Sequence, residues 1–102
     1  MVLIVLEKVP ASLRGELSRW LIEIKSGVFL GKASALVREE LFSICAKKMG
    51  GGGFHMIHPW QCEQGYIIRS AGNVSRQVID FEGIQFVRTP IKDRKVDANL
   101  AF

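Results

Sequence analysis

The first residues of the chain are its strongest constraint on the fold. The run Val2–Leu6 contains only apolar residues, and no polar residue alternates with them. A strand with one solvated face would show such alternation, so this run predicts a central strand that is covered on both faces. Pro10 follows shortly afterwards, and because proline disrupts a central strand we expect this strand to end before it.

Two later segments repeat apolar residues at helical spacing. In the first segment we expect Ser12 to cap a helix that extends to about residue 24, and in the second we expect Ser34 to act as the cap. The apolar positions are Leu13, Leu17, Trp20, Leu21 and Ile24 in the first segment, and Val37, Leu41, Ile44 and Cys45 in the second. Each segment predicts a helix that lays one apolar face on a sheet.

Short β-forming runs occupy most of the remaining chain. The expected strands are 28–30, 54–58, 66–70, 77–81 and 84–87, with the last two joined as a hairpin. The glycines at 50–53 end the second helix, and we expect them to form a mobile connector. This order favours an α+β ferredoxin-like sandwich with two helices on one face of an antiparallel sheet. The late strands exceed what one such sheet needs, so we expect a homodimer in which they pair across the interface.

Composition limits the class of protein. The chain has 102 residues, 48% of them hydrophobic, and a net charge of +4. We place one domain at residues 1–90 and a charged tail at 91–102. The two cysteines cannot form the disulfide framework of a small secreted domain, and the apolar N-terminus is too short to span a bilayer. These features predict a cytoplasmic protein with no membrane partner, and the basic excess favours polyanions without requiring them.

An ordered series of motifs links the chain to a known family. The series is Glu7-Lys8-Val9-Pro10, Leu13-Arg14-Gly15, Arg19-Trp20-Leu21-Ile22-Glu23, Ser26-Gly27-Val28-Phe29-Leu30-Gly31, Ala33-Ser34-Ala35-Leu36-Val37-Arg38-Glu39, Gly65-Tyr66-Ile67 and Arg76-Gln77-Val78-Ile79-Asp80-Phe81-Glu82-Gly83. Over residues 2 to about 90 this series resembles the Cas-two family of CRISPR-associated proteins in its type I-E branch. The chain departs from the pattern at Ser12, where some relatives carry an arginine, and in a longer tail from Lys92.

The resemblance implies a role in acquiring new CRISPR spacers. In the family, a dimer of this subunit bridges two dimers of the Cas-one integrase and holds a short DNA duplex, while the integration chemistry resides in the integrase. The implied partners are therefore a second copy, the Cas-one subunit and double-stranded DNA. Such a scaffold requires no cofactor.

Five basic residues are candidate contacts to the DNA backbone. The family match makes Arg14 the foremost candidate, and a guanidinium can bind two phosphate oxygens. Arg76 corresponds to a position on the duplex-facing surface in the family. Lys25, Lys32 and Arg38 would extend this surface if the fold gathers them on one side, although each alone is also typical of a solvated charge. Recognition should then depend on salt and not on sequence.

Glu7 is the candidate for a metal-dependent endonuclease, which is the alternative function. In some members of the family the corresponding acid faces its symmetry mate and is linked to a divalent metal and to nuclease activity. Two such carboxylates would bind Mg²⁺ with water completing the shell. We favour an acid without a catalytic role, because one carboxylate per chain is a poor metal site and the sequence shows no neighbouring base.

Other residues suggest sites that the sequence supports less well. Zinc at His55, His58 and Cys62 is disfavoured, because on a strand the two histidines would point to opposite faces and a closed site needs four ligands. Base stacking on Trp60 would need single-stranded substrate, so we favour packing of this ring beneath the loop. A generic RNA-binding or small-ligand module remains a third class. The end of the tail, residues 100–102, is interpreted equally well as frayed or as inserted into the integrase.

Overall fold

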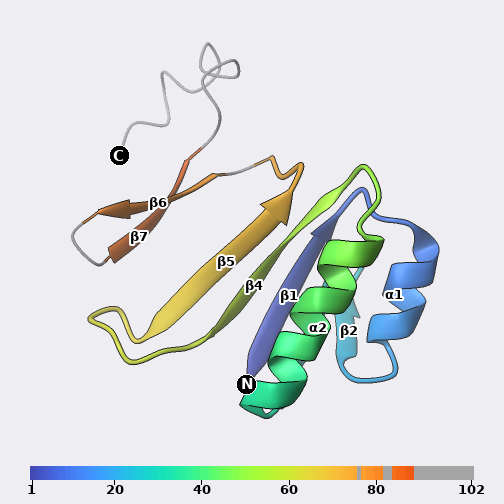
Figure 1. The fold of residues 1–102 in the computed structure, drawn as a ribbon, viewed down its shortest axis with the longest axis horizontal. Helices are drawn as coiled ribbons and strands as arrows, with labels where there is room; N and C mark the ends of the chain where they lie inside the picture. Colours follow the sequence, from blue (N-terminus) through green and yellow to red (C-terminus); the bar gives the residue numbers. More distant parts are fainter. Residues whose placement is uncertain (76, 82–83, 89–102) are drawn as a thin grey trace.

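The computed structural model describes residues 1–75, 77–81 and 84–88 (Figure 1). Its elements are β1 (Val2–Glu7), α1 (Ala11–Leu17), β2 (Ile22–Lys25), β3 (Val28–Gly31), α2 (Ala35–Lys48), β4 (Gly53–Pro59), β5 (Tyr66–Gly72), β6 (Gln77–Phe81) and β7 (Ile84–Arg88). Five strands form one antiparallel sheet in the order β2-β3-β1-β4-β5, and β6 and β7 form a separate hairpin. The first six elements follow the βαββαβ order of the ferredoxin-like class, so the predicted α+β fold is confirmed.

The strand β1 lies in the middle of the sheet and pairs with β3 and β4. Val2, Ile4 and Leu6 are buried on the face that carries both helices (Figure 1). Leu3 and Val5 point to the other face and are only partly buried. The prediction of a strand covered on both faces is therefore wrong for the single described chain, because both helices lie on the same side of the sheet.

The core lies between the two helices and the sheet. Its buried residues are Val2, Ile4, Leu6, Leu13, Leu17, Leu21, Phe29, Leu41, Cys45, Phe54 and Met56. Phe42 of α2 packs edge-to-face on Phe54 of β4, with ring centroids 5.1 Å apart. This layer fixes α2 above β4 and so determines which side chains of α2 reach the edge of the sheet.

The first helix is shorter than predicted. The α-helix ends at Leu17, and Ile22–Lys25 is the strand β2, which pairs with β3. The helical spacing of the apolar residues was misleading because residues 22–25 also alternate apolar and polar, and pairing with β3 selects the strand. Ser12 is not the cap, since α1 begins after Pro10 without a side-chain cap, whereas the predicted cap at Ser34 is confirmed by a bond from the Val37 N–H at 3.2 Å.

Two of the four glycines after α2, Gly52 and Gly53, are closely packed against other backbone segments. The prediction of a mobile connector is therefore wrong for these two residues. A Cβ on Gly52 would collide with the carbonyl oxygens of Glu7 and Lys8, and Gly53 is already the first residue of β4. Glycine is required here because two backbone segments approach too closely for any side chain.

The late hairpin was predicted correctly, and Gln85 of β7 holds it beside the edge strand β5. Its side-chain amide accepts from the Ile68 N–H at 2.7 Å and donates to the Ile68 carbonyl at 2.8 Å. In this way the amide occupies a short stretch of the open edge of β5, as a neighbouring strand would. Within the described residues, no helix is long and apolar enough to cross a membrane.

Candidate nucleic-acid interface

Arg14 lies on α1 and is held by Glu23 of β2. Its Nε and Nη2 donate to Oε2 of Glu23 at 3.2 and 3.1 Å, and the Gly27 N–H donates to the same oxygen at 2.9 Å. The bond from Gly27, followed by the contact with Arg14, lowers the pKa of Glu23, so its carboxylate is charged at neutral pH. The Arg14 side chain is 41% exposed, which leaves part of its guanidinium open to a phosphate.

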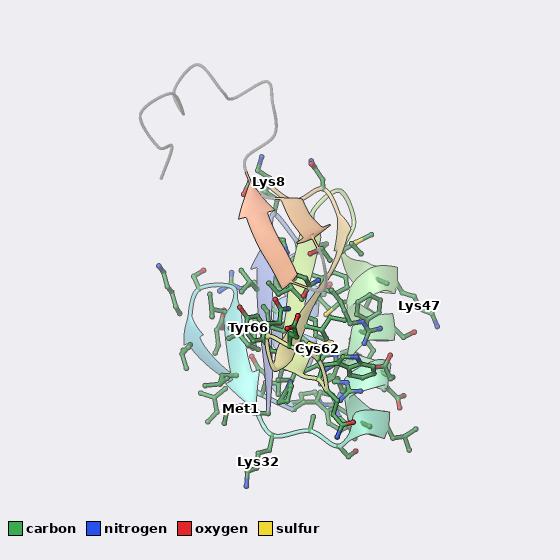
Figure 2. All side chains as sticks on the ribbon, turned by 90° about the vertical axis from the view of Figure 1, so that its left-hand side faces the viewer. Met1, Lys8, Lys32, Lys47, Cys62 and Tyr66 are labelled. Atoms are coloured by element: carbon green, nitrogen blue, oxygen red, sulfur yellow. The ribbon has the colours of Figure 1, made fainter. Side chains whose placement is uncertain are left out.

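The two lysine candidates do not lie together. Lys25 ends β2 and pairs with Val28, the first residue of β3, whereas Lys32 follows β3 at the far end of that strand. Figure 2 shows Lys32 at the opposite end of the molecule from Lys8, which follows β1. The fold therefore places Lys25 and Lys32 at opposite ends of β3 and does not gather the two lysines on one side. Arg76 and the tail at 89–102 lie outside the described residues.

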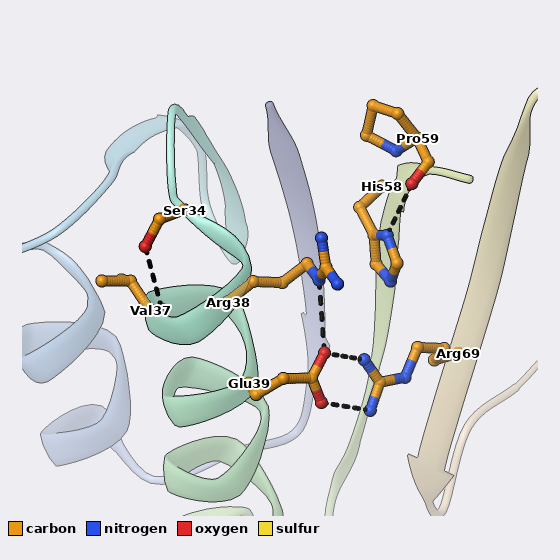
Figure 3. Close-up of polar contacts among 7 residues, drawn as sticks. All are labelled: Ser34, Val37, Arg38, Glu39, His58, Pro59 and Arg69. Atoms are coloured by element: carbon orange, nitrogen blue, oxygen red, sulfur yellow. Dashed lines mark hydrogen bonds and ion pairs between the residues drawn. The ribbon is translucent and has the colours of Figure 1, made fainter. Parts of the chain in front are cut away.

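Arg38 belongs to a cluster in which one carboxylate holds two guanidiniums (Figure 3). Arg69 of β5 donates to both oxygens of Glu39, at 2.6 and 3.0 Å, and Arg38 donates from Nε to Oε2 at 3.2 Å. The bonds from Arg69, with those from Arg38, lower the pKa of Glu39 to about 2. The cluster thus keeps a net charge of about +1 through the neutral range.

His58 of β4 lies next to this cluster and is 2% exposed. Its Nδ1 lies 2.9 Å from the Pro59 carbonyl oxygen, so Nδ1 carries the hydrogen and Nε2 of the neutral ring is an acceptor. Nε2 is buried without a hydrogen-bond partner in the described part of the chain. Burial lowers the pKa of His58, and the nearby Arg38 and Arg69 act in the same direction.

A groove of about 470 Å³ opens over these residues, and we call it the Trp60 groove. Its lining consists of Arg38, Glu39, His58, Trp60, Ile67 and Arg69. The Trp60 ring is 51% exposed, packs edge-to-face on His58 with centroids 5.6 Å apart, and lies 5.9 Å from Cζ of Arg38. The groove therefore combines an exposed aromatic ring, a positive charge and a buried acceptor.

Glu7 lies at the end of β1 on the face without helices. Its Oε1 accepts from the Ser75 N–H at 2.9 Å, and its Oε2 accepts from the Ser75 hydroxyl at 3.2 Å. His55 of β4 places Nε2 3.8 Å from Oε2 and Nδ1 2.6 Å from the Ser70 hydroxyl oxygen. No group of three or more metal-binding side chains occurs among residues 1–75, 77–81 and 84–88, and at this place Glu7 is accompanied by His55 alone.

The face of the sheet away from the helices, which we call the open sheet face, is apolar along a complete row. Directly paired residues cross all five strands in the order Ile22, Leu30, Leu3, Ile57 and Ile68. A second row runs through Val28, Val5, His55 and Ser70. Ile22 is 71% exposed, and the other four residues of the first row are only partly buried. Such a contiguous apolar surface is typical of an interaction site.

The three residues considered for zinc do not come together. His58 is buried on the helix side of β4, and His55 lies on the open sheet face, as the strand alternation predicted. Cys62 is exposed and its thiol donates to the Tyr66 carbonyl oxygen at 3.4 Å. Cys45 is a buried core residue, and burial raises the pKa of its thiol to about 12.

A family model described as "CRISPR-associated protein (Cas_Cas2CT1978)" matches residues 1–86. This match covers most of the chain. The chain belongs to this Cas-two family. The family assignment agrees with the resemblance carried by the ordered motifs, and it places the protein among those that serve CRISPR adaptation.

Sequence reasoning missed the residues that join α2 to the sheet edge in this Cas-two chain. Arg69 and Glu39 lie 30 positions apart, and only the packing of α2 over β4 brings their side chains into contact. His58 was considered only as a zinc ligand. The available signal was the polar residue at 58, which follows Phe54 and Met56 on the buried side of the strand alternation.

Proposed function

We propose that this protein is a duplex-DNA-binding scaffold of CRISPR adaptation, of the type I-E branch, and that a dimer of it bridges two Cas-one integrase dimers in the cytoplasm. Membership of the Cas-two family carries this proposal. The bonds of the new spacer are made by the integrase, and this chain contributes shape and positive charge.

Dimerisation through the open sheet face accounts for the apolar row. The five residues of that row bring one apolar side chain from every strand to one surface. A two-fold interface uses the same patch on both copies, so a self-complementary apolar face suits it. A second copy would also cover β1 on its other side, which is the environment that the run Val2–Leu6 predicts. The late hairpin would add strand pairing across this interface.

DNA binding is assigned first to Arg14, with Arg76, Lys25, Lys32 and Arg38 as further contacts. Arg14 is partly exposed and is fixed in position by Glu23, so a phosphate would meet an already oriented guanidinium. Contacts of this kind read the backbone and carry no sequence information. That property suits a protein whose captured DNA varies in sequence.

Paired variants test the role of Arg14. We expect Arg14→Gln to weaken duplex binding several-fold and to reduce the salt slope by about one, as loss of one phosphate contact does. Glu23→Gln should strengthen binding, because it removes a negative charge beside Arg14. Lys47→Gln, which removes a charge from the last turn of α2, is the charge-matched control. Equal duplex affinities of Arg14→Gln and Lys47→Gln would show that Arg14 does not contact the DNA.

The alternative function is a metal-dependent endonuclease, and the position of Glu7 on the open sheet face is the observation that favours it. In a face-to-face dimer, Glu7 from both copies would lie near the axis and supply two carboxylates for Mg²⁺. The test compares Glu7→Gln with the wild type. If spacer acquisition survives and any cleavage disappears, the scaffold is the function and cleavage is a separate activity of Glu7. If acquisition and cleavage are lost together in a folded dimer, the nuclease becomes the function.

A further inference from the structure

The Trp60 groove contains a combination of groups that the duplex-binding surface does not need. It lies between α2 and the β5 edge of the sheet, whereas Arg14 and Lys25 belong to α1 and β2, toward the opposite edge (Figure 1). Three observations point to a ligand for it. They are an exposed aromatic ring and two groups that lack a hydrogen-bond partner among the described residues, the terminal nitrogens of Arg38 and a buried acceptor on His58.

The first observation concerns charge. Arg38 uses only Nε in its bond to Glu39, and its two terminal nitrogens have no hydrogen-bond partner in the part of the chain that the structure describes. Its side chain is only 17% exposed, so the guanidinium is held within the groove wall and does not extend into solvent. Two guanidiniums against one carboxylate leave a fixed positive charge, which suits an anion such as phosphate.

The second observation concerns shape. Trp60, half exposed and close to Arg38, offers a flat surface on which a planar ring can stack.

The third observation concerns hydrogen bonding. In Figure 3 the far end of the His58 ring points toward the space between Arg38 and Arg69. Its buried Nε2 lacks a donor among the described residues, and leaving such an atom without a hydrogen bond costs free energy that a bound N–H group would recover.

We propose that the Trp60 groove binds a single nucleotide. The base lies on Trp60 with an exocyclic N–H directed to Nε2 of His58, and the phosphate is bound by the terminal nitrogens of Arg38. This chemistry has two sources, an unpaired nucleotide at the end of a DNA duplex and a free mononucleotide. An unpaired duplex end rests on the proposed function, whereas a free nucleotide does not.

The experiment uses the fluorescence of Trp60 in the full chain. Trp20→Phe leaves Trp60 as the single tryptophan, and Trp20 is itself half exposed and outside the groove. The probes are a blunt duplex, the same duplex with one unpaired adenine at each 3′ end, and deoxyadenosine monophosphate. We expect the unpaired adenine to quench Trp60 and to tighten binding about tenfold, whereas the blunt duplex should bind without quenching.

Variants of the groove separate it from the duplex-binding surface. Trp60→Leu should abolish the preference for the unpaired adenine and leave the affinity for the blunt duplex unchanged. Arg38→Gln should abolish the same preference. Lys47→Gln, which removes a charge from the same helix, should keep the preference. Far-ultraviolet circular dichroism checks folding, and the quenching experiment on the Trp20→Phe chain stands even if a groove variant fails to fold.

The outcomes distinguish the two proposals. Quenching by the nucleotide monophosphate alone, without any duplex binding, would support the groove and overturn the scaffold function. Duplex binding without quenching by any nucleotide probe would overturn the groove and leave the scaffold function standing. Quenching by an N-acetylated Glu–Tyr dipeptide amide, with no response to the nucleotides, would also overturn the assignment, because the groove would then select a peptide.

Discussion

Two carboxylates, Glu23 and Glu39, orient the arginines that we assign to nucleic acid. Glu23 joins Arg14 to the turn at Gly27, and Glu39 joins Arg38 to Arg69 of β5. The sequence predicted Arg14 and Arg38 as basic residues with exposed or DNA-facing side chains, but it did not predict the acids that hold them. Arg14 and Glu23 are nine positions apart and come from a helix and a strand, so no periodicity within one element pairs them.

His58 gives the folded protein a pH dependence with a definite sign. Burial lowers the pKa of this ring below the ordinary value of 6.5. As the pH falls below 6.5, the unfolded chain binds a proton that the folded chain does not, so the free energy of unfolding decreases. When the pH is lowered from about 7.5 to about 5, we expect the free energy of unfolding to fall less in His58→Phe than in the wild type. Urea denaturation at the two pH values measures this difference.

The other histidine provides the control for this prediction. His55 lies on the opposite face of β4 beside Glu7, and His55→Gln removes this imidazole while leaving His58 in place. The decrease in the free energy of unfolding between the two pH values should persist in His55→Gln. An unchanged pH dependence in His58→Phe would mean that the buried ring is not its source.

At the scale of the elements, the sequence predicted each described helix and strand except β2, and it extended α1 over the residues that form β2. The segment 20–25 satisfies both the helical spacing that begins at Leu13 and the alternation of a strand. Local patterns cannot choose between these periods, and the choice comes from the ladder that β2 forms with β3 and from the Glu23 carboxylate bound to Gly27. The strands after α2 were predicted closely because glycine, proline or turn residues mark their ends.

The connection between α2 and β4 allows a matched test of close packing. Gly52→Ala would place a Cβ against the backbone oxygens of Glu7 and Lys8, whereas a Cβ on Gly51 meets nothing within 4 Å. We expect Gly52→Ala to lower the free energy of unfolding by about 2–3 kcal/mol, since the backbone must shift to accommodate it. Gly51→Ala should change it by no more than about 0.5 kcal/mol in urea denaturation. Equal effects of the two variants would show that the two backbone segments are not in close contact.

At the scale of the whole molecule, we propose that the open sheet face joins two copies of the protein. Ile57 lies near the middle of the apolar row, paired with Leu3 and Ile68. We expect Ile57→Asp to convert a dimer into a folded monomer, because an unpaired carboxylate would be buried in the proposed interface. Light scattering after size-exclusion chromatography measures the mass.

The exposed Leu36 of α2 provides the control for the dimer. It is 80% exposed and lies on the helix side of the molecule, so Leu36→Asp introduces the same charge away from the open sheet face. This variant should remain a dimer. A monomeric wild type, or a dimer that survives Ile57→Asp, would place the interface elsewhere.

The mass of the protein–duplex complex tests the central claim most directly. Sedimentation of the full chain with two short duplexes of unrelated sequence gives both the stoichiometry and the affinity. We expect two chains per duplex in each case, with similar affinities that fall as salt is added, because the contacts are to phosphate. Three results would contradict a dimeric scaffold that binds the DNA backbone. They are a single chain on the DNA, a strong preference for one sequence, and no binding at low salt.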